Sequence, residues 1–293
     1  MFRKALALLL ALPILSGSAA AHACATCGAG DPTLQIVGME QPIEGRFRVG
    51  AVVTHQSITD DDAETYDQRL TLGATWAFGD AAVLSLSLPL VWREVSYRTL
   101  AYDQTLGLGD ADLRVRATLF RDRSFAPAHR LLLDLGSRLP TGMVLGDAQG
   151  LLPLQAQPGT GAFEPNVGLL WISNVDDFSV WAQANVAFPF TGTDGWRNGI
   201  ALRANVAVQW QPLTELAVRV LADSRFEGAS GRITETLPSE VNSALFLGGG
   251  VVVAPATDWV MHLVVRVPAL GVYPSHPRHS EGVNVELGVA LDV

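Results

Sequence analysis

The sequence predicts an all-β protein whose strands close into a transmembrane, antiparallel, up-and-down β-barrel. Three observations carry this prediction: side chains alternate between polar and apolar along twelve runs, connections alternate between short and long, and aromatic residues gather near both ends of the runs. Only 17% of the residues are charged, against about 25% in soluble domains, so the surface is short of charge. The hydrophobic content of 48% excludes a disordered chain, and the net charge of −9 argues against a nucleic-acid partner.

The first 23 residues predict a secretory signal peptide. Arg3 and Lys4 precede an apolar stretch, residues 5–15, and small residues fill positions 16–21. Cleavage is expected after Ala21 or after Ala23, which leaves a periplasmic segment, 24–43, ahead of a barrel, 44–293. The expected location is the cell outer membrane, and the expected partners are outer-membrane lipid and the barrel-assembly machinery.

The strands follow from side-chain period, which is clearest at 110–119, where even positions are polar and odd positions are apolar. Successive side chains of a strand point to opposite faces, so each run has a polar face and an apolar face. Each run has about the length that a tilted strand needs to cross a bilayer. The runs are 46–57, 66–78, 81–93, 109–121, 129–140, 162–173, 177–189, 199–211, 215–226, 243–255, 258–268 and 283–293.

The connections supply the second observation. Those after the even-numbered runs are mostly short: 79–80, 122–128, 174–176, 212–214 and 256–257. Those after the odd-numbered runs are longer, as in 94–108, 141–161, 227–242 and 269–282. Short periplasmic turns and long extracellular loops, with an even strand count, are typical of outer-membrane barrels.

Aromatic residues of the apolar faces supply the third observation, because such rings prefer the two interfaces of a bilayer. Near the short turns these are Phe47, Trp76, Phe78, Trp171, Phe178, Trp210 and Trp259; near the long loops they are Tyr66, Trp92, Phe163, Phe188 and Phe226. In this register Phe120 and Trp181 are exceptions that point inward. The chain ends in Val293, where outer-membrane barrels commonly end in an aromatic residue.

The polar faces carry many arginines, and we expect them to line the barrel interior: Arg46, Arg48, Arg69, Arg93, Arg114, Arg116, Arg138, Arg203, Arg219, Arg225 and Arg266. The same faces carry acids: Asp67, Asp110, Asp112, Asp134, Glu164, Asp223, Glu286 and Asp292. Fixed guanidinium groups can bind anions and set the charge preference of a passage. Alternatively, the arginines pair with the acids and hold the wall together, and the two readings are compatible.

Three glycine-rich motifs give the chain a family resemblance over roughly residues 44–293: Leu106-Gly107-Leu108-Gly109-Asp110-Ala111-Asp112-Leu113-Arg114, Pro140-Thr141-Gly142 after 133–139, and Pro158-Gly159-Thr160-Gly161. With them the chain resembles the outer-membrane barrels of the meta-pathway of phenol degradation-like transporter family. The resemblance implies an outer-membrane channel or transporter, with uptake of hydrophobic or aromatic compounds in some members.

The connection 141–161 is unusually apolar for an exposed loop. We expect it, with Leu151, Leu152 and Leu154, to fold into the mouth as a constriction or as a landing site for an apolar solute.

Cys24 and Cys27 form a Cys-x-x-Cys pair at the predicted mature N-terminus. A disulfide or tether, a soft metal ion such as Cu(I), redox exchange and lipidation all remain open for this pair. Two thiolates are too few for a closed zinc site, and Gly28 stands where covalent haem attachment needs histidine.

The sequence therefore favours a channel that passes small solutes, hydrophobic, aromatic or anionic, without a cofactor. A barrel that anchors a metal-binding or redox module at the cysteine pair is the alternative, and a non-conducting structural barrel is a third. Enzymatic activity is not expected, because the strand residues His55 and Ser57 lack an orienting acid. His276 and His279 could bind a metal ion, but a solvated loop is the simpler reading.

Overall fold

The computed structural model of the chain describes residues 47–59, 63–79, 81–123, 127–147, 150–152, 156–228, 231–232, 241–272 and 279–293. The predicted signal peptide, the segment 24–43 and the acidic residues 60–62 lie outside the described residues. So do Cys24, Cys27, Arg46, Leu154 and His276, and the predictions that name them stay predictions.

Twelve long antiparallel strands form the wall, as the alternation predicts. They are β1 (Phe47–Thr59), β2 (Ala63–Phe78), β3 (Ala82–Tyr97), β5 (Ala111–Arg121), β6 (His129–Leu139), β9 (Glu164–Val175), β10 (Phe178–Ala187), β12 (Ala201–Leu213), β13 (Leu216–Gly228), β15 (Val241–Ala256), β16 (Trp259–Val272) and β18 (Asn284–Asp292). Each strand overlaps its predicted run, and the bounds differ by four residues at most.

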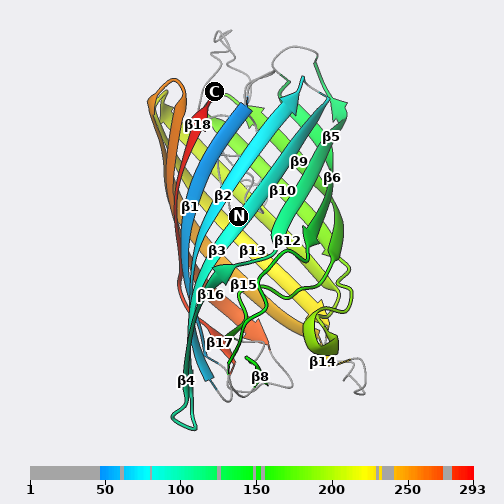
Figure 1. Cartoon of the computed structure of the whole chain (residues 1–293). Helices are drawn as coiled ribbons and strands as arrows, with labels where there is room; N and C mark the ends of the chain where they lie inside the picture. Colours follow the sequence, from blue (N-terminus) through cyan, green and yellow to red (C-terminus); the bar gives the residue numbers. More distant parts are fainter. Residues whose placement is uncertain are drawn as a thin grey trace, which may run out of the picture.

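The strands close into a barrel because β1 pairs with β2 on one edge and with β18 on the other (Figure 1). Phe47 and Val293 exchange backbone hydrogen bonds at this seam, and Arg48 Nη2 donates to Asp292 Oδ2 at 2.7 Å beside them. We call the end with the short connections and both of these residues the turn end, and the opposite end the loop end. A short 3-10 turn, η2 (Thr193–Gly195), lies in the connection between β10 and β12.

Short strands lie in the connections at the loop end: β4 (Tyr102–Leu108), β7 (Gly146–Asp147), β8 (Gly150–Leu151), β11 (Trp196–Arg197), β14 (Gly231–Arg232) and β17 (Ser280–Glu281). The predicted connection 94–108 contains regular structure, because β3 runs on to Tyr97 and β4 pairs back along it. The connection after the first strand is also shorter than predicted. Residues of β1 and β2 stay paired as far as Thr59 and Glu64, which leaves only 60–62 between the strands.

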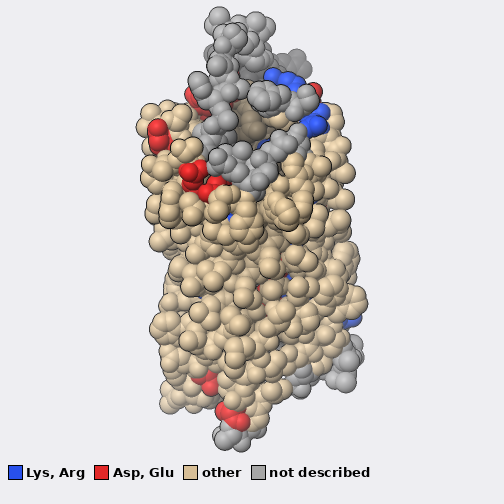
Figure 2. Space-filling model, turned by 45° about the horizontal axis from the view of Figure 1, so that its top comes forward, with Lys and Arg blue, Asp and Glu red and all other residues tan. Residues whose placement is uncertain are grey.

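The outside of the barrel is apolar between two aromatic rims. All twelve outward aromatics predicted for the rims are exposed, and Figure 2 shows the charged residues confined mostly to the two ends of the molecule. Phe120 corrects the prediction: a register shift between Thr118 and Phe120 turns its ring outward, whereas Trp181 points inward and is buried. None of the described helices is long and apolar enough to cross a membrane.

Glycines of β15 make room for larger inward side chains of the neighbouring strands. A Cβ on Gly248 would lie 2.9 Å from Leu221 Cδ1, and a Cβ on Gly250 would lie 2.8 Å from Val264 Cγ2. Leu221 on β13 and Val264 on β16 therefore fold over the glycine backbone from both sides. This packing explains the glycines at 248 and 250 within the strand β15.

Candidate functional site: the barrel interior

Arginines face the solvent-accessible interior in the loop-end half, and their carboxylate partners lie behind them. Arg138, Arg203 and Arg225 have side chains that are 32%, 39% and 38% exposed, whereas their partners Glu164 and Glu281 are 5% and 3% exposed. Glu164 accepts from Arg138 Nη1 and Arg203 Nη2, at 3.3 Å each, and Arg225 Nη2 donates to Glu281. A solute in this half of the barrel therefore meets guanidinium groups before it meets these carboxylates.

A second pair of arginines shares one carboxylate on β2 and β3. Asp67 accepts from Arg69 Nε at 2.7 Å and from Arg93 Nε at 2.9 Å. Arg93 also reaches the connection 141–161, where its Nη1 donates to the Gln157 backbone oxygen at 2.6 Å. Arg93 thus ties the wall to the loop that the sequence places in the mouth.

Asp110 anchors both ends of that loop. Its carboxylate accepts from the backbone N–H of Gly142 at 2.9 Å, from the backbone N–H of Thr160 at 2.6 Å and from the Thr160 hydroxyl at 2.8 Å. A Cβ on Gly142 or Gly159 would lie 2.7 or 2.9 Å from Asp110 Oδ1, so both positions need glycine for the close approach. The three glycine-rich motifs noted in the sequence therefore meet at one carboxylate.

The middle of the connection packs against the inner face of the wall. Ala156 is buried against Ala63 and Val95, which point inward from β2 and β3, and Leu152 packs at the edge of the same cluster. The side chain of Gln157 connects two parts of the loop. Its Oε1 accepts from the Leu145 backbone N–H, and its Nε2 donates to the backbone oxygens of Leu145 and Leu152. Leu151, by contrast, is exposed.

Deeper in the barrel the charges are buried and paired. Arg114 Nη1 and Arg116 Nη2 donate to Asp134 at 3.0 and 3.3 Å, Gln183 donates to the same carboxylate at 2.7 Å, and Asp112 lies 3.5 Å from Arg114. These contacts match the interpretation of a wall held by ion pairs.

A second buried chain of charges crosses from β13 to β18. Arg266 lies 2.8 Å from both Asp223 and Glu286, and His262 Nε2 lies 3.1 Å from the other oxygen of Glu286. Each carboxylate of this chain therefore meets a positive or polar partner inside the barrel.

Apolar side chains fill the interior around the middle and toward the turn end. Trp181 is the largest of them, with Arg219 Cζ 5.0 Å from its ring centroid, and Arg219 also donates to Gln209 at 2.8 Å. The cluster runs across the strands from β6 to β16: Leu132, Leu170, Ile172, Trp181, Ala207, Leu221 and Val264. Water therefore has access to arginines in the loop-end half, while the turn-end half is packed with buried side chains.

The interior groups several residues that sequence reasoning missed. Glu281, the partner of Arg225, comes from β17 within a segment predicted as loop, so no strand pattern marks it. Gln157 gives no signal either, because a single glutamine in a loop has no period. Trp181 is not one of them, because the sequence already predicts that it points inward, and it is 3% exposed.

Other candidate sites show no comparable arrangement. Within the described residues, no group of three or more His, Cys, Asp or Glu side chains is arranged to hold a metal ion. His279 Nε2 lies 3.9 Å from Glu281 Oε1. His55 is exposed on the outer face of β1, and the backbone of Ser57 accepts from the Gly282 N–H at 2.8 Å.

No family model matches the sequence, and no curated protein matches it. The fold is similar to that of an outer membrane channel from Pseudomonas putida F1, with 12% identity, a TM-score of 0.70, and coverage of 90% of this chain and 99% of that one. It is also similar to the β domain of a Bordetella autotransporter, with 12% identity, a TM-score of 0.53, and coverage of 85% and 100%. The shared fold and the apolar outer belt are those of a β-barrel protein of the outer membrane.

Proposed function

We propose that this barrel is an outer-membrane channel that passes small solutes and prefers anions. The observation that carries the proposal is the unequal exposure of the ion pairs in the loop-end half. Arg138, Arg203 and Arg225 reach the accessible interior, and Glu164 and Glu281 lie beneath them.

Because the arginines are more exposed than their carboxylate partners, the electrostatic potential of the accessible interior is positive. This holds even where arginines and carboxylates are equal in number. A guanidinium group offers five N–H donors in a fixed plane and stays charged at every physiological pH. An anion that enters the loop end finds these donors accessible, whereas Glu164 and Glu281 offer a cation little accessible surface. Charged rings of one sign favour ions of the opposite sign in pores.

Two features narrow the class of solute. The family resemblance favours hydrophobic or aromatic compounds, and the connection 141–161 presents apolar side chains near the mouth. Anchored at Asp110 and Arg93, this loop would act as the gate on the outer side, while the cluster around Trp181 would limit flux on the inner side. Solute recognition would need no cofactor.

Current through the refolded mature protein in a planar bilayer tests the proposal. In a potassium chloride gradient we expect discrete current steps. The sign of the reversal potential should show that chloride passes more readily than potassium. Replacing Arg138, Arg203 and Arg225 together by Gln should move the reversal potential toward potassium. Heat-modifiable migration on a gel controls for folding. A folded barrel that carries no current, with or without Trp181→Ala, would contradict the proposal.

A further inference from the structure

Two arginines of the interior stand directly opposite each other on neighbouring strands. Arg203 on β12 and Arg225 on β13 are partners in the strand register. Side chains at opposite positions of antiparallel strands have Cβ atoms about 5 Å apart, and like charges placed this way destabilise a sheet. Each guanidinium is instead held to a different carboxylate, Arg203 to Glu164 and Arg225 to Glu281.

The acids pull the two side chains toward different strands and leave both guanidinium groups accessible. Glu164 belongs to β9 and also binds Arg138 of β6, and Glu281 belongs to β17 at the opposite side of the pair. Glu227, the remaining acid here, lies 3.8 Å from Arg225 Nε. Arg203 and Arg225 thus place two accessible positive groups on neighbouring strands, and Arg138 lies near Arg203 because both bind Glu164.

We propose that this pair forms a binding site for a small organic carboxylate in transit through the barrel. The inference deepens the proposed channel function and rests on it. A planar carboxylate can accept hydrogen bonds from one guanidinium fork or bridge two guanidinium groups. Glu164 shows the bridging arrangement, with one oxygen on Arg138 and the other on Arg203. A solute carboxylate between Arg203 and Arg225 would also relieve the repulsion between them.

The site favours transit over tight capture. Arg203 and Arg225 are each more than a third exposed, so water screens their charge and weakens any single contact. Conduction requires sites that bind well enough to attract a solute and weakly enough to release it. The two arginines therefore suit a selectivity site, whereas the buried Asp134 and Glu286 networks suit the support of the wall.

Two measurements with the folded mature protein test the site. Sodium benzoate is added to a bilayer that carries chloride current, and the same anion is titrated calorimetrically into the protein in detergent micelles. Benzamide, which lacks the charge, is the ligand control. We expect saturable interruptions of the current and saturable binding with benzoate alone. Arg203→Gln or Arg225→Gln should weaken both by roughly tenfold or more, because each removes charge-assisted hydrogen bonds.

A matched control separates this effect from a general loss of positive charge. Arg123 lies exposed in the periplasmic turn after β5, so Arg123→Gln changes the net charge equally and should leave benzoate binding unchanged. Chloride current without benzoate binding, or binding that survives both lumen substitutions, overturns the site and leaves the channel intact. Binding that depends on Arg203 and Arg225 in a barrel without current supports the site and overturns the channel.

Discussion

Asp110 shows how a single carboxylate can fix the geometry of a barrel mouth. It accepts three hydrogen bonds from the two ends of the connection 141–161, two from backbone N–H groups and one from Thr160 Oγ1. Hydrogen bonds to a charged acceptor contribute more than neutral ones, about 1.5–3 kcal/mol each. The two ends of the loop therefore share this one side chain as their anchor.

Replacing Asp110 by Ala should release the loop from the mouth. We expect a single-channel current with a larger mean and frequent transitions between levels, because the loop ends lose their common anchor. Recordings in planar bilayers measure this directly. Asp177→Asn, in the short turn between β9 and β10, removes a charge at the turn end, away from the loop, and should leave the current steady. Identical traces for Asp110→Ala and the wild-type protein would show that the loop does not gate.

Trp181 is the residue whose removal should open the turn-end half. Its ring packs in the apolar cluster and under Arg219, and truncating a buried aromatic residue costs about 3–5 kcal/mol in well-packed cores. We expect Trp181→Ala to raise the conductance and Trp181→Phe to stay near the wild-type value, since Phe keeps most of the volume. An unchanged conductance in a folded Trp181→Ala barrel would place the main barrier elsewhere.

At the scale of the element, strand positions follow from sequence better than the connections do. Period two marks every long strand, because one face meets lipid and the other meets the interior along its whole length. The pairing of β3 with β4 was not predicted, because this hairpin continues beyond the bilayer, where no lipid selects apolar residues on one face. Phe120 was misplaced because a bulge changes which face a residue takes without leaving a mark in the local sequence.

Alanine substitutions at two neighbouring glycines of β15 should have different effects on stability, because the two glycines lie on opposite faces of the strand. A Cβ on Gly250 would meet the Leu263 backbone oxygen at 2.5 Å, whereas a Cβ on Gly249 would meet only the Arg219 oxygen at 3.5 Å. Gly250→Ala should therefore lower the free energy of unfolding by about 1–3 kcal/mol through overpacking, and Gly249→Ala should not. Urea unfolding in lipid vesicles measures both. Equal stability of the two variants would contradict the observed packing.

Across the whole molecule, the sequence predicts the inward face but not the pairing within it. The acid and base positions follow from the alternation, yet Glu281 reaches Arg225 only because β17 folds back beside β1. Asp110, expected among the residues of the passage, is engaged with the loop instead. Which arginines remain accessible depends on the depth of each residue and on what packs over it, and neither has a periodic signal.

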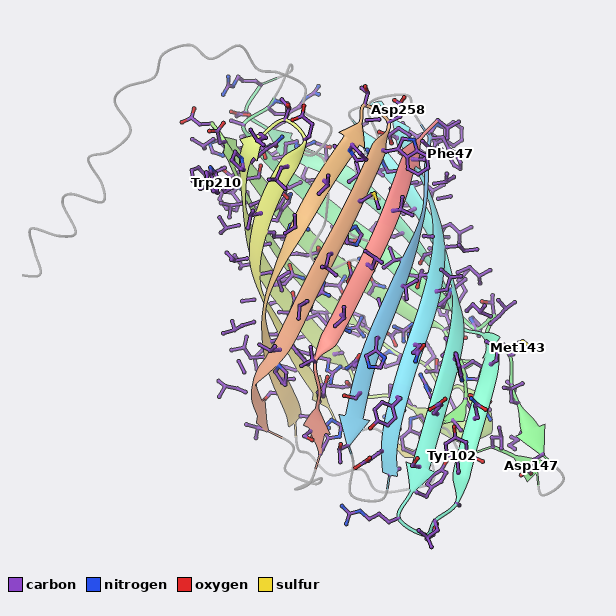
Figure 3. All side chains as sticks on the ribbon, turned by 90° about the vertical axis from the view of Figure 1, so that its left-hand side faces the viewer. Phe47, Tyr102, Met143, Asp147, Trp210 and Asp258 are labelled. Atoms are coloured by element: carbon purple, nitrogen blue, oxygen red, sulfur yellow. The ribbon has the colours of Figure 1, made fainter. Side chains whose placement is uncertain are left out.

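The two ends of the barrel provide a final prediction, about orientation in the membrane. Asp147 lies at the loop end and Asp258 at the turn end, as Figure 3 shows. Both are polar connection residues, so cysteine at either position should be tolerated once Cys24 and Cys27 are replaced by Ser. If the loops are extracellular, a membrane-impermeant maleimide should label Asp147→Cys on intact cells and Asp258→Cys only after permeabilisation. The reverse labelling pattern would show that the barrel has the opposite orientation in the membrane. The exposed arginines would then face the periplasm instead of the incoming solute.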